Sequence, residues 1–520
     1  MIKKTVLILL LIFGAGFANE YLVKVALTQD RLTPLAEKNL KIVGELENSA
    51  ILIADAADLE KISSYSYQIL DQNPQEGSYY LVRLIDSKID LSTFGMILAN
   101  DGNDYLIKIN QGMLETLIKE KVMIKRLTLT PIVSRGAAPT FQFMYNSTVQ
   151  EIVDLVNPDS VLSDVQRLQD FVTRYSTHDS CFAAANWIAS KFVDYGCDSV
   201  FLQSHDPSHA PNVIGIKRGV VYPDSIYAVV CGHFDATSLF APDIAPGADD
   251  NASGTAAVIE AARVMKDYNF EYSVRYIAFS GEEFGLYGSE YYAQLANSHD
   301  DSIIGVLNGD MIGYVDALPE SLEVIAMDYT CEPLADFFIA CADSYTTLLT
   351  RKRIEYAPFS DHYSFWYYGY VAICNIEDDW PVNPYYHEPG DTIGAGYNNN
   401  GFCTEVIKTE VAALATIAEP YHDPGIDEFE KLTTHNVSLS VYPCISKGPF
   451  TISYVLNEPK AKVTLNIYDV TGALVKSFSK QSPIIWNGTD DSGYKLPAGV
   501  YLLRIEPDQV DATAKLILLR

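Results

Sequence analysis

The residues PGADDNASG at positions 246–254 decide the fold, because a short acidic loop here passes directly into an Ala-rich helix. Two further polar blocks flank this loop: GHFD at 232–235 lies before it, and GEEFG at 281–285 lies after it. Apolar, β-rich runs at 226–231 and 274–280 precede these two blocks. The polar side chains are therefore expected where strands end in loops, which is the edge at which open α/β sheets bind ligands.

Strands and helices alternate along the central part of the chain. After a polar, helical entry at about 150–192, the pattern predicts strands at 199–202, 212–217, 226–231, 274–280, 303–307, 322–327 and 371–376. It predicts helices at 253–266, 289–296, 333–345 and 404–418. Such alternation is typical of a mostly parallel sheet with helices on both faces, so we predict one large α/β domain at 141–420.

The composition indicates a globular protein with large cores, because 48% of the 520 residues are hydrophobic. Acidic residues number 67 against 37 basic ones, which gives a formal net charge of −30. This balance argues against nucleic acid or an anionic membrane surface as a partner. The eight cysteines are too few for a disulfide scaffold and show no CxxC spacing for a metal ion.

Residues 1–18 are predicted to be a secretory signal. The chain begins with the basic stretch MIKK, continues with an apolar run at 5–13, and has small residues at Gly16 and Ala18, after which cleavage is expected. The apolar run is too short for a permanent membrane span, and no later stretch is long and apolar enough. We therefore expect a secreted or cell-surface protein without a permanent span.

Residues 19–134 contain an internal repeat. YLVKV at 21–25 corresponds to YLVRL at 80–84, and the run at 51–62 corresponds to the run at 105–117. Two copies of strand, strand, helix, strand fit this pattern. The region has no histidine, so we predict an α+β pro-region or a permanent accessory domain without catalytic groups. The segment SRGAAP at 134–139 resembles a cleavable linker, which favours the pro-region.

The three polar blocks carry side chains suited to metal-assisted chemistry. His233 and Asp235 face the same side of an extended chain, so the carboxylate can fix the imidazole tautomer, although an ordinary surface hydrogen bond has the same pattern. In the loop 246–254 one carboxylate can bridge two metal ions, although a helix N-cap requires the same residue types. Glu282 and Glu283 diverge at a turn, so one can bind a cation while the other accepts a proton.

Two more candidates are expected at the same edge of the sheet. Asp310 follows the strand at 303–307, and His387 lies in the loop after the strand at 371–376. Two of the nine histidines thus join the carboxylates at successive loops. Nitrogen and oxygen donors without a thiolate suit zinc, with cobalt and manganese as alternatives.

These residues resemble the zinc-dependent M28 aminopeptidases, which have a co-catalytic dinuclear site. The match covers about 150–418 and consists of five blocks in the family's order and approximate spacing: GHFDA at 232–236, PGADDNASG at 246–254, GEEFGLYGS at 281–289, NGDM at 308–311 and YHEPGDT at 386–392. The segment Ser360-Asp361-His362 resembles one beside the substrate pocket of such enzymes, but an internally bonded loop explains it equally well.

The resemblance implies two zinc ions and a peptide substrate with a free N-terminus. One zinc ion would be held by His233 and Asp310, and the other by Glu283 and His387. Asp249 would bridge both ions. By the same resemblance, Asp235 orients His233, and Glu282 is the general base for water attack on the peptide bond.

The composition changes again near the C-terminus. We predict a linker at 421–436 and a small β-sandwich at 437–520, with strands at 450–455, 462–469 and 499–505. NIYD at 466–469, WNGTD at 486–490 and PAGVY at 497–501 resemble C-terminal sorting domains of bacterial secretion systems. This resemblance implies contact with export or cell-surface machinery; the alternative is a passive stabilising or carbohydrate-contacting module.

The leading prediction is an exported zinc metallo-aminopeptidase. A glutaminyl-cyclase-like member of the same fold is an alternative, although cyclases of this kind use one zinc ion. A carboxypeptidase is another alternative, because Arg351 or Arg353 is available to bind a terminal carboxylate. A non-catalytic surface binding module is the third, but such a module need not retain a full set of metal ligands.

Overall fold

The computed structural model describes residues 20–27, 35, 38–133, 140–317, 319–378, 380, 382–421, 437–442, 445–456, 464–478, 484–506 and 512–519. The chain divides into two compact units, Met1–Tyr421 and His422–Arg520. The predicted signal at 1–18, the segment at 134–139 and all but the first residue of the predicted linker at 421–436 lie outside the described residues.

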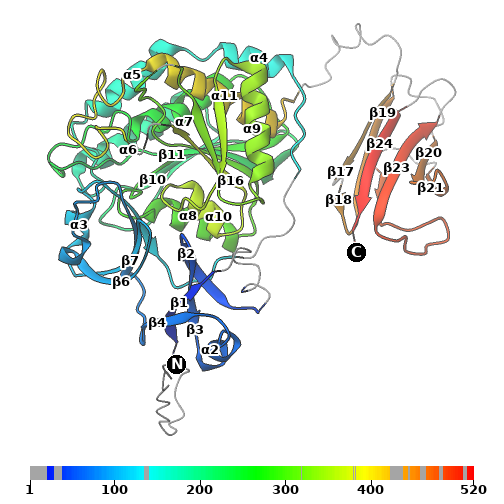
Figure 1. Cartoon of the computed structure of the whole chain (residues 1–520). Coiled ribbons are helices and arrows are strands. Elements are labelled where there is room, and N and C mark those ends of the chain that lie inside the picture. Colours follow the sequence, from blue (N-terminus) through cyan, green and yellow to red (C-terminus); the bar gives the residue numbers. More distant parts are fainter. Residues whose placement is uncertain are drawn as a thin grey trace. The chain divides into compact units, whose positions relative to one another are not determined.

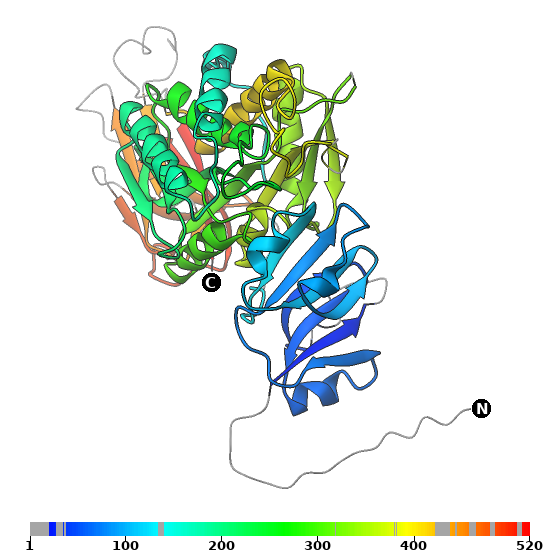
Figure 2. The same ribbon diagram turned by 90° about the vertical axis from the view of Figure 1, so that its left-hand side faces the viewer.

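The N-terminal part of the first unit consists of two four-stranded sheets. The first sheet comprises β1 (Tyr21–Ala26), β2 (Lys41–Leu46), β3 (Ser49–Ala54) and β4 (Tyr67–Asp71), with helix α2 (Ala56–Lys61). The second comprises β5 (Tyr79–Leu84), β6 (Gly95–Asp101), β7 (Asp104–Ile109) and β8 (Val122–Leu127), with η1 (Leu91–Thr93) and α3 (Leu114–Leu117). In Figure 2 the second sheet lies between the first sheet and the central domain.

The two N-terminal sheets have the same topology. Their strand orders are β2-β3-β1-β4 and β6-β7-β5-β8, so the first strand of each copy is an inner strand in both. Each copy holds one strand more than the sequence pattern predicted. The additional strands β2 and β6 contain glycine and charged or amide residues, which weakens the alternation that marks a strand.

The central sheet of the first unit is formed by strands in the order β15-β14-β16-β13-β11-β12-β10-β9. Their bounds are β9 (Ser199–Gln203), β10 (Asn212–Lys217), β11 (Tyr222–His233), β12 (Tyr272–Phe279), β13 (Ser302–Gly309), β14 (Leu322–Ala326), β15 (Thr350–Ile354) and β16 (Ala372–Glu377). Parallel pairing joins β12, β11, β13 and β16, and it also joins β14 to β15. Strands β9, β10 and β14 make antiparallel pairs, so the sheet is mixed and its parallel middle carries the loops of interest.

Helices cover both faces of this sheet. They are α4 (Ser147–Asp154), α5 (Pro158–Gln169), α6 (Asp179–Asp194), α7 (Ala252–Met265), α8 (Tyr287–Ser298), α9 (Glu332–Tyr345), α10 (His362–Tyr367) and α11 (Asn400–Ala418). Figure 1 shows α8 and α10 on one face and α7 and α11 on the other. The main hydrophobic core lies between the sheet and these helices.

The second unit is a β-sandwich. One sheet has the order β17-β19-β22 and the other β18-β24-β23-β20-β21. The strands are β17 (Val437–Tyr442), β18 (Ile445–Ser446), β19 (Phe450–Leu456), β20 (Thr464–Asp469), β21 (Leu474–Phe478), β22 (Ile484–Trp486), β23 (Gly499–Glu506) and β24 (Ala512–Leu518). Phe450 and Trp486 from the first sheet pack with Leu465, Leu503 and Leu516 from the second, which gives the sandwich its own core.

Helix α7 packs directly on the backbone of the central sheet because glycine stands at the contact. A Cβ atom on Gly254, in the first turn of α7, would lie 2.1 Å from the carbonyl oxygen of Gly309 at the end of β13. A Cβ atom on Gly232 of β11 would lie 2.9 Å from the same oxygen. These glycines therefore hold the start of α7 against the two strand ends that carry His233 and Asp310.

Gly254→Ala is expected to lower the free energy of unfolding by about 1–3 kcal/mol, because the added methyl group meets backbone that cannot move aside cheaply. Gly401→Ala, at the start of α11, is the matched control: its nearest neighbour is Asn399 Oδ1 at 3.3 Å. We expect the control to change stability by less than about 1 kcal/mol. Urea unfolding of both variants measures this, and equal stability of the two would contradict the close packing of α7.

Candidate metal centre

His233 is the last residue of β11, and its imidazole faces three carboxylates. The side chain is 1% exposed. Its Nε2 atom lies 3.4 Å from Asp250 Oδ1 and 3.4 Å from Asp310 Oδ1. Glu282 Oε2 is 3.9 Å from the same nitrogen. His233 and Asp310 are 77 residues apart in the chain. They meet because β11, which ends at His233, and β13, which ends just before Asp310, are parallel neighbours.

His387 forms the second half of the cluster. Its Nε2 atom lies 3.0 Å from Glu283 Oε2 and 3.7 Å from Asp250 Oδ2. The backbone at His387 is left-handed, with φ of 54°, and its carbonyl oxygen accepts a hydrogen bond from the Leu239 N–H at 3.1 Å. Asp250 therefore directs one carboxylate oxygen toward each histidine.

Asp249, which the sequence analysis placed between two metal ions, points elsewhere. Its Oδ1 accepts a hydrogen bond from the Gly313 N–H at 2.8 Å, and its Oδ2 accepts one from Asn383 Nδ2 at 3.2 Å. Of the two aspartates, Asp250 is the one whose oxygens face both histidines. The physical reason is that neighbouring side chains of the loop diverge, so only one of the two aspartates can face the histidines.

Asp235 lies behind His233, but the main-chain carbonyl oxygen of Asp235 is closer to the imidazole than the carboxylate that the spacing predicted as its partner. The Nδ1 atom of His233 lies 3.1 Å from the Asp235 carbonyl oxygen and 3.8 Å from Oδ1 of its carboxylate. The same Oδ1 accepts the Glu282 N–H at 3.3 Å. Asp235 thus connects the His233 loop to the Glu282 loop, and burial raises the pKa of its carboxyl group to about 7.

Glu283 and Asp310 each have a polar partner that fixes one carboxylate oxygen. Glu283 Oε1 accepts the Thr237 N–H at 3.1 Å, which leaves Oε2 toward His387. Asp310 Oδ2 accepts a hydrogen bond from the Ser360 hydroxyl at 2.5 Å, which leaves Oδ1 toward His233. Ser360 belongs to the Ser360-Asp361-His362 segment that the sequence analysis left outside the metal site, and the structure shows it holding a candidate ligand in place.

Burial of like charges dominates the electrostatics of the cluster. Burial and the neighbouring carboxylates raise the pKa of Glu282 and of Asp250 well above their ordinary values. The pKa of Asp310 is lowered, since contact with His233 and Ser360 outweighs the effect of burial. Burial lowers the pKa of His387, but Glu283 beside it raises the pKa by more, to about 9.

The donor set fits a metal cation. The residues form two groups, and within each group the ligand atoms all lie within 4.8 Å of one another. One group consists of His233, Glu282 and Asp310, and the other of His233, Asp250 and Glu283. Buried carboxylates at this spacing are costly unless a cation compensates their charge. Imidazole nitrogens and carboxylate oxygens are the ligands that zinc takes in catalytic sites.

Arg174 anchors two of the loops that carry this cluster. Its guanidinium is fully buried and donates to four carbonyl oxygens: Phe234 at 2.6 Å, Leu168 at 3.0 Å, Pro246 at 2.5 Å and Gly247 at 2.7 Å. Phe234 follows His233, while Pro246 and Gly247 precede Asp250. The sequence does not predict this role. Arg174 stands in the loop after α5, and no sequence pattern indicates that a single arginine binds backbone carbonyl oxygens.

Buried imidazoles and carboxylates at the ends of parallel strands are the residue types that metal-dependent hydrolases use. The model of Peptidase family M28 matches residues 212–408, and the model of the FlgD Ig-like domain matches residues 441–510. The central domain thus matches the model of Peptidase family M28, and the chain is a hydrolase.

Curated relatives agree with this assignment. A probable aminopeptidase of Saccharomyces cerevisiae is 29% identical over 275 residues, which are 49% of this chain and 73% of the yeast protein. A probable zinc metalloprotease of Pyrenophora teres f. teres is 34% identical over 188 residues, which are 32% of this chain and 39% of that protein. The chain therefore spans well under half of the Pyrenophora protein.

A solved structure shares the fold. The aminopeptidase LapA of Legionella pneumophila aligns with a TM-score of 0.51 at 19% identity, over 78% of this chain and 100% of the solved chain. At this identity the likeness concerns the fold alone.

The different directions of Asp249 and Asp250 can be tested by matched substitutions. Asp250→Asn is expected to lose at least one of the zinc ions bound per chain, because it removes the carboxylate that faces both histidines. Asp249→Asn is expected to keep the wild-type zinc content. Metal analysis after dialysis against zinc-free buffer measures both, and loss of zinc in Asp249→Asn alone would restore Asp249 as the bridging candidate.

The stability of the chelated protein is expected to depend on pH. Asp235, Asp250, Glu282 and His387 have raised pKa values in the folded state, so their protonation stabilises the fold at low pH and this stabilisation is lost as pH rises. Asp310 opposes the trend, since its pKa is lowered. The gain in melting temperature on adding zinc should therefore grow between about pH 5 and about pH 8, also because zinc competes less with protons. A gain that shrinks over this range would contradict the electrostatic account.

Proposed function

We propose that this protein is an exported zinc aminopeptidase that hydrolyses the N-terminal peptide bond of peptides. The observation that carries the proposal is the position of Asp250, whose two oxygens lie 3.4 Å from His233 Nε2 and 3.7 Å from His387 Nε2. A carboxylate shared by two imidazoles is suited to two metal ions side by side. The match to Peptidase family M28 and the names of the yeast and fungal relatives support the same activity.

Two zinc ions are proposed, each with its own histidine. His233 and Asp310 would hold one ion, His387 and Glu283 would hold the other, and Asp250 would be shared. Each pair already lies within 3.4 Å in the structure. When bound, two zinc ions lower the pKa of a shared water molecule and polarise the scissile carbonyl group.

Glu282 is the proposed general base. Its carboxylate faces the cluster, 3.9 Å from His233 Nε2, while its backbone N–H is held by Asp235. Burial and the neighbouring carboxylates raise its pKa, which brings it closer to the range in which a group can both accept and release a proton. Glu282 therefore accepts the proton of the attacking water and donates it to the amine nitrogen of the leaving peptide.

The proposed preference for a free N-terminus is supported by the name of the yeast relative, a probable aminopeptidase.

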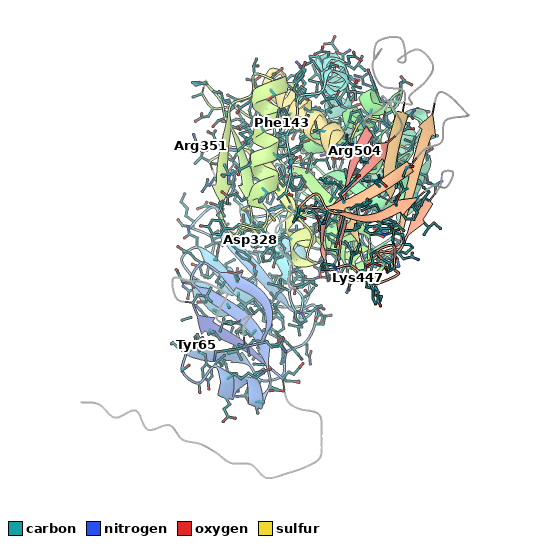
Figure 3. All side chains as sticks on the ribbon, turned by 90° about the vertical axis from the view of Figure 1, so that its right-hand side faces the viewer. Tyr65, Phe143, Asp328, Arg351, Lys447 and Arg504 are labelled. Atoms are coloured by element: carbon teal, nitrogen blue, oxygen red, sulfur yellow. The ribbon has the colours of Figure 1, made fainter. Side chains whose placement is uncertain are left out.

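The carboxypeptidase alternative is not favoured by the surroundings of its candidate arginines. Arg351 and Arg353 lie on β15, the edge strand of the central sheet, whereas the cluster lies beyond β11, β12, β13 and β16. Arg351 pairs with Glu323 and Asp378, and Arg353 pairs with Glu323 and Glu355. Arg351 lies at the edge of the central domain in Figure 3, and both arginines are at least partly exposed and already paired with carboxylates, which does not favour a role in binding a substrate carboxylate at the cluster.

Export is proposed from the two ends of the chain. The first 18 residues have the pattern of a secretory signal, and the C-terminal unit matches the FlgD Ig-like domain. A role of this unit in contact with export or cell-surface machinery is part of the proposal. Among the residues that the structure describes, no helix is both long and apolar enough to cross a bilayer.

A substitution at Glu282 tests the activity and the base together. Glu282→Gln is expected to keep its zinc and to lower kcat on an aminoacyl p-nitroanilide by about 10²- to 10⁴-fold, because the shape is retained and the proton acceptor is lost. Glu332→Gln is the matched control, since Glu332 lies on α9 and pairs with Lys352. The wild-type protein should not cleave the N-acetylated substrate at a comparable rate.

Two outcomes would overturn this proposal. Equal cleavage of free and N-acetylated substrates by the wild-type protein would exclude an aminopeptidase. Glu282→Gln with nearly full turnover would show that another group is the base.

A further inference from the structure

The segment just before β8, in the second N-terminal sheet, touches the back of a candidate zinc ligand. The carbonyl oxygen of Glu120 lies 2.9 Å from His387 Nδ1. A carbonyl oxygen only accepts hydrogen bonds, so Nδ1 carries a proton and Nε2 is the nitrogen left for a metal ion once its own proton is lost. Nε2 lies 3.0 Å from Glu283 Oε2, so the contact at Nδ1 selects the tautomer that binds a metal ion.

The same segment also fixes the loop of the proposed general base. The Arg126 N–H, in β8, donates to the Gly285 carbonyl oxygen at 3.3 Å. A Cβ atom on Gly285 would lie 2.6 Å from that Arg126 nitrogen, and its φ is 102°. Glycine at this position therefore allows β8 to lie directly against the turn that follows Glu282 and Glu283.

Polar contacts hold β8 in place around these two points. Lys125 Nζ lies 2.7 Å from Glu290 Oε2, and both side chains are almost fully buried. Lys121 Nζ donates to the Pro384 carbonyl oxygen at 3.0 Å and lies 3.1 Å from Glu388 Oε1. A charged pair buried in this way fixes geometry, because either partner alone would be an uncompensated charge.

Apolar packing continues the same interface. Val122 and Ile124 of β8 share one core cluster with Ala236 and Phe284, the neighbours of Asp235 and Glu283. On the other side of the strand, Met123 packs against the cluster that contains Met311 and Tyr386, the neighbours of Asp310 and His387. The hydroxyl group of Tyr386 also donates to the Val122 carbonyl oxygen at 3.2 Å.

We propose that residues 120–126 form a clamp that positions His387 and the Glu282–Glu283 loop for zinc binding, so that the N-terminal sheets remain part of the active enzyme. This inference rests on the proposed function of the cluster as a zinc site. The clamp contacts His387 at Nδ1, on the side of the ring away from the carboxylates, so it supports the ligand and does not compete with the metal ion. It also replaces the expectation of a removable pro-region with that of a retained positioning module.

Reversal of one clamp charge provides the test in the full-length chain. Lys121→Glu replaces attraction to Glu388 by repulsion and removes the bond to the Pro384 carbonyl oxygen, which moves the His387 loop away from Glu120. We expect the Kd of the weaker zinc site to rise about tenfold, in the range found for partners that orient metal ligands. The double variant Lys121→Glu with Glu388→Lys should recover most of the zinc affinity.

Zinc affinity is measured by competition with a chromophoric chelator, and the absorption spectrum of the cobalt-substituted protein reports the ligand geometry. Lys61→Glu is the control, because Lys61 pairs with Asp58 on helix α2 and the substitution makes the same change of charge. We expect the control to leave zinc affinity and the cobalt spectrum unchanged. A zinc Kd of Lys121→Glu within twofold of the wild-type value would overturn the proposal that residues 120–126 position the zinc ligands.

Proteolysis distinguishes a retained module from a removable one. With a specific protease site placed at 134–139, we expect the cut fragments to co-elute on size exclusion with unchanged zinc affinity, or to lose zinc if they separate. A central fragment that elutes free of the N-terminal sheets with wild-type zinc affinity would overturn the proposal. Failure of the intact wild-type chain to bind zinc or to hydrolyse aminoacyl substrates would instead overturn the proposed function.

Discussion

The mutual repulsion of buried carboxylates is the constraint on which the rest of this structure depends. Asp250, Glu282, Glu283 and Asp310 lie together around two imidazoles with little exposure to water. Such a cluster is costly as anions, and the folded chain therefore has to hold it in place until cations compensate the charge. The neighbouring donors, Thr237 N–H and Ser360 hydroxyl among them, each fix one oxygen and leave the other toward a histidine.

The scaffold meets this constraint with contacts to the backbone. Arg174 binds carbonyl oxygens on both sides of the cluster, and the glycines of β11, α7 and β13 let helix and strands approach closely. The second N-terminal sheet adds a main-chain oxygen behind His387 and a main-chain N–H at the Glu282–Glu283 turn. Main-chain groups carry no net charge, so they restrain the ligands and leave the charge of the centre unchanged.

Much of this arrangement follows from the sequence, because strand ends are marked by apolar runs that stop at polar residues. That pattern alone predicts that His233, Glu282, Glu283, Asp310 and His387 lie near one another. It did not separate Asp249 from Asp250, since neighbouring residues share every local signal and the path of the loop decides which one faces the histidines. It also missed β15 and the contact from Glu120: β15 is charged, and a carbonyl oxygen has no signature in the sequence.

The place of β8 in the chain has a consequence for truncation. The contacts behind the candidate ligands come from residues 120–126, which lie well before residues 281–289 and 386–392 in the sequence. A chain shortened past β8 would keep every candidate ligand and lose the carbonyl oxygen of Glu120 behind His387 and the Arg126 N–H at Gly285. The boundary of a functional catalytic fragment therefore lies before residue 120, and not at the first helix of the central domain.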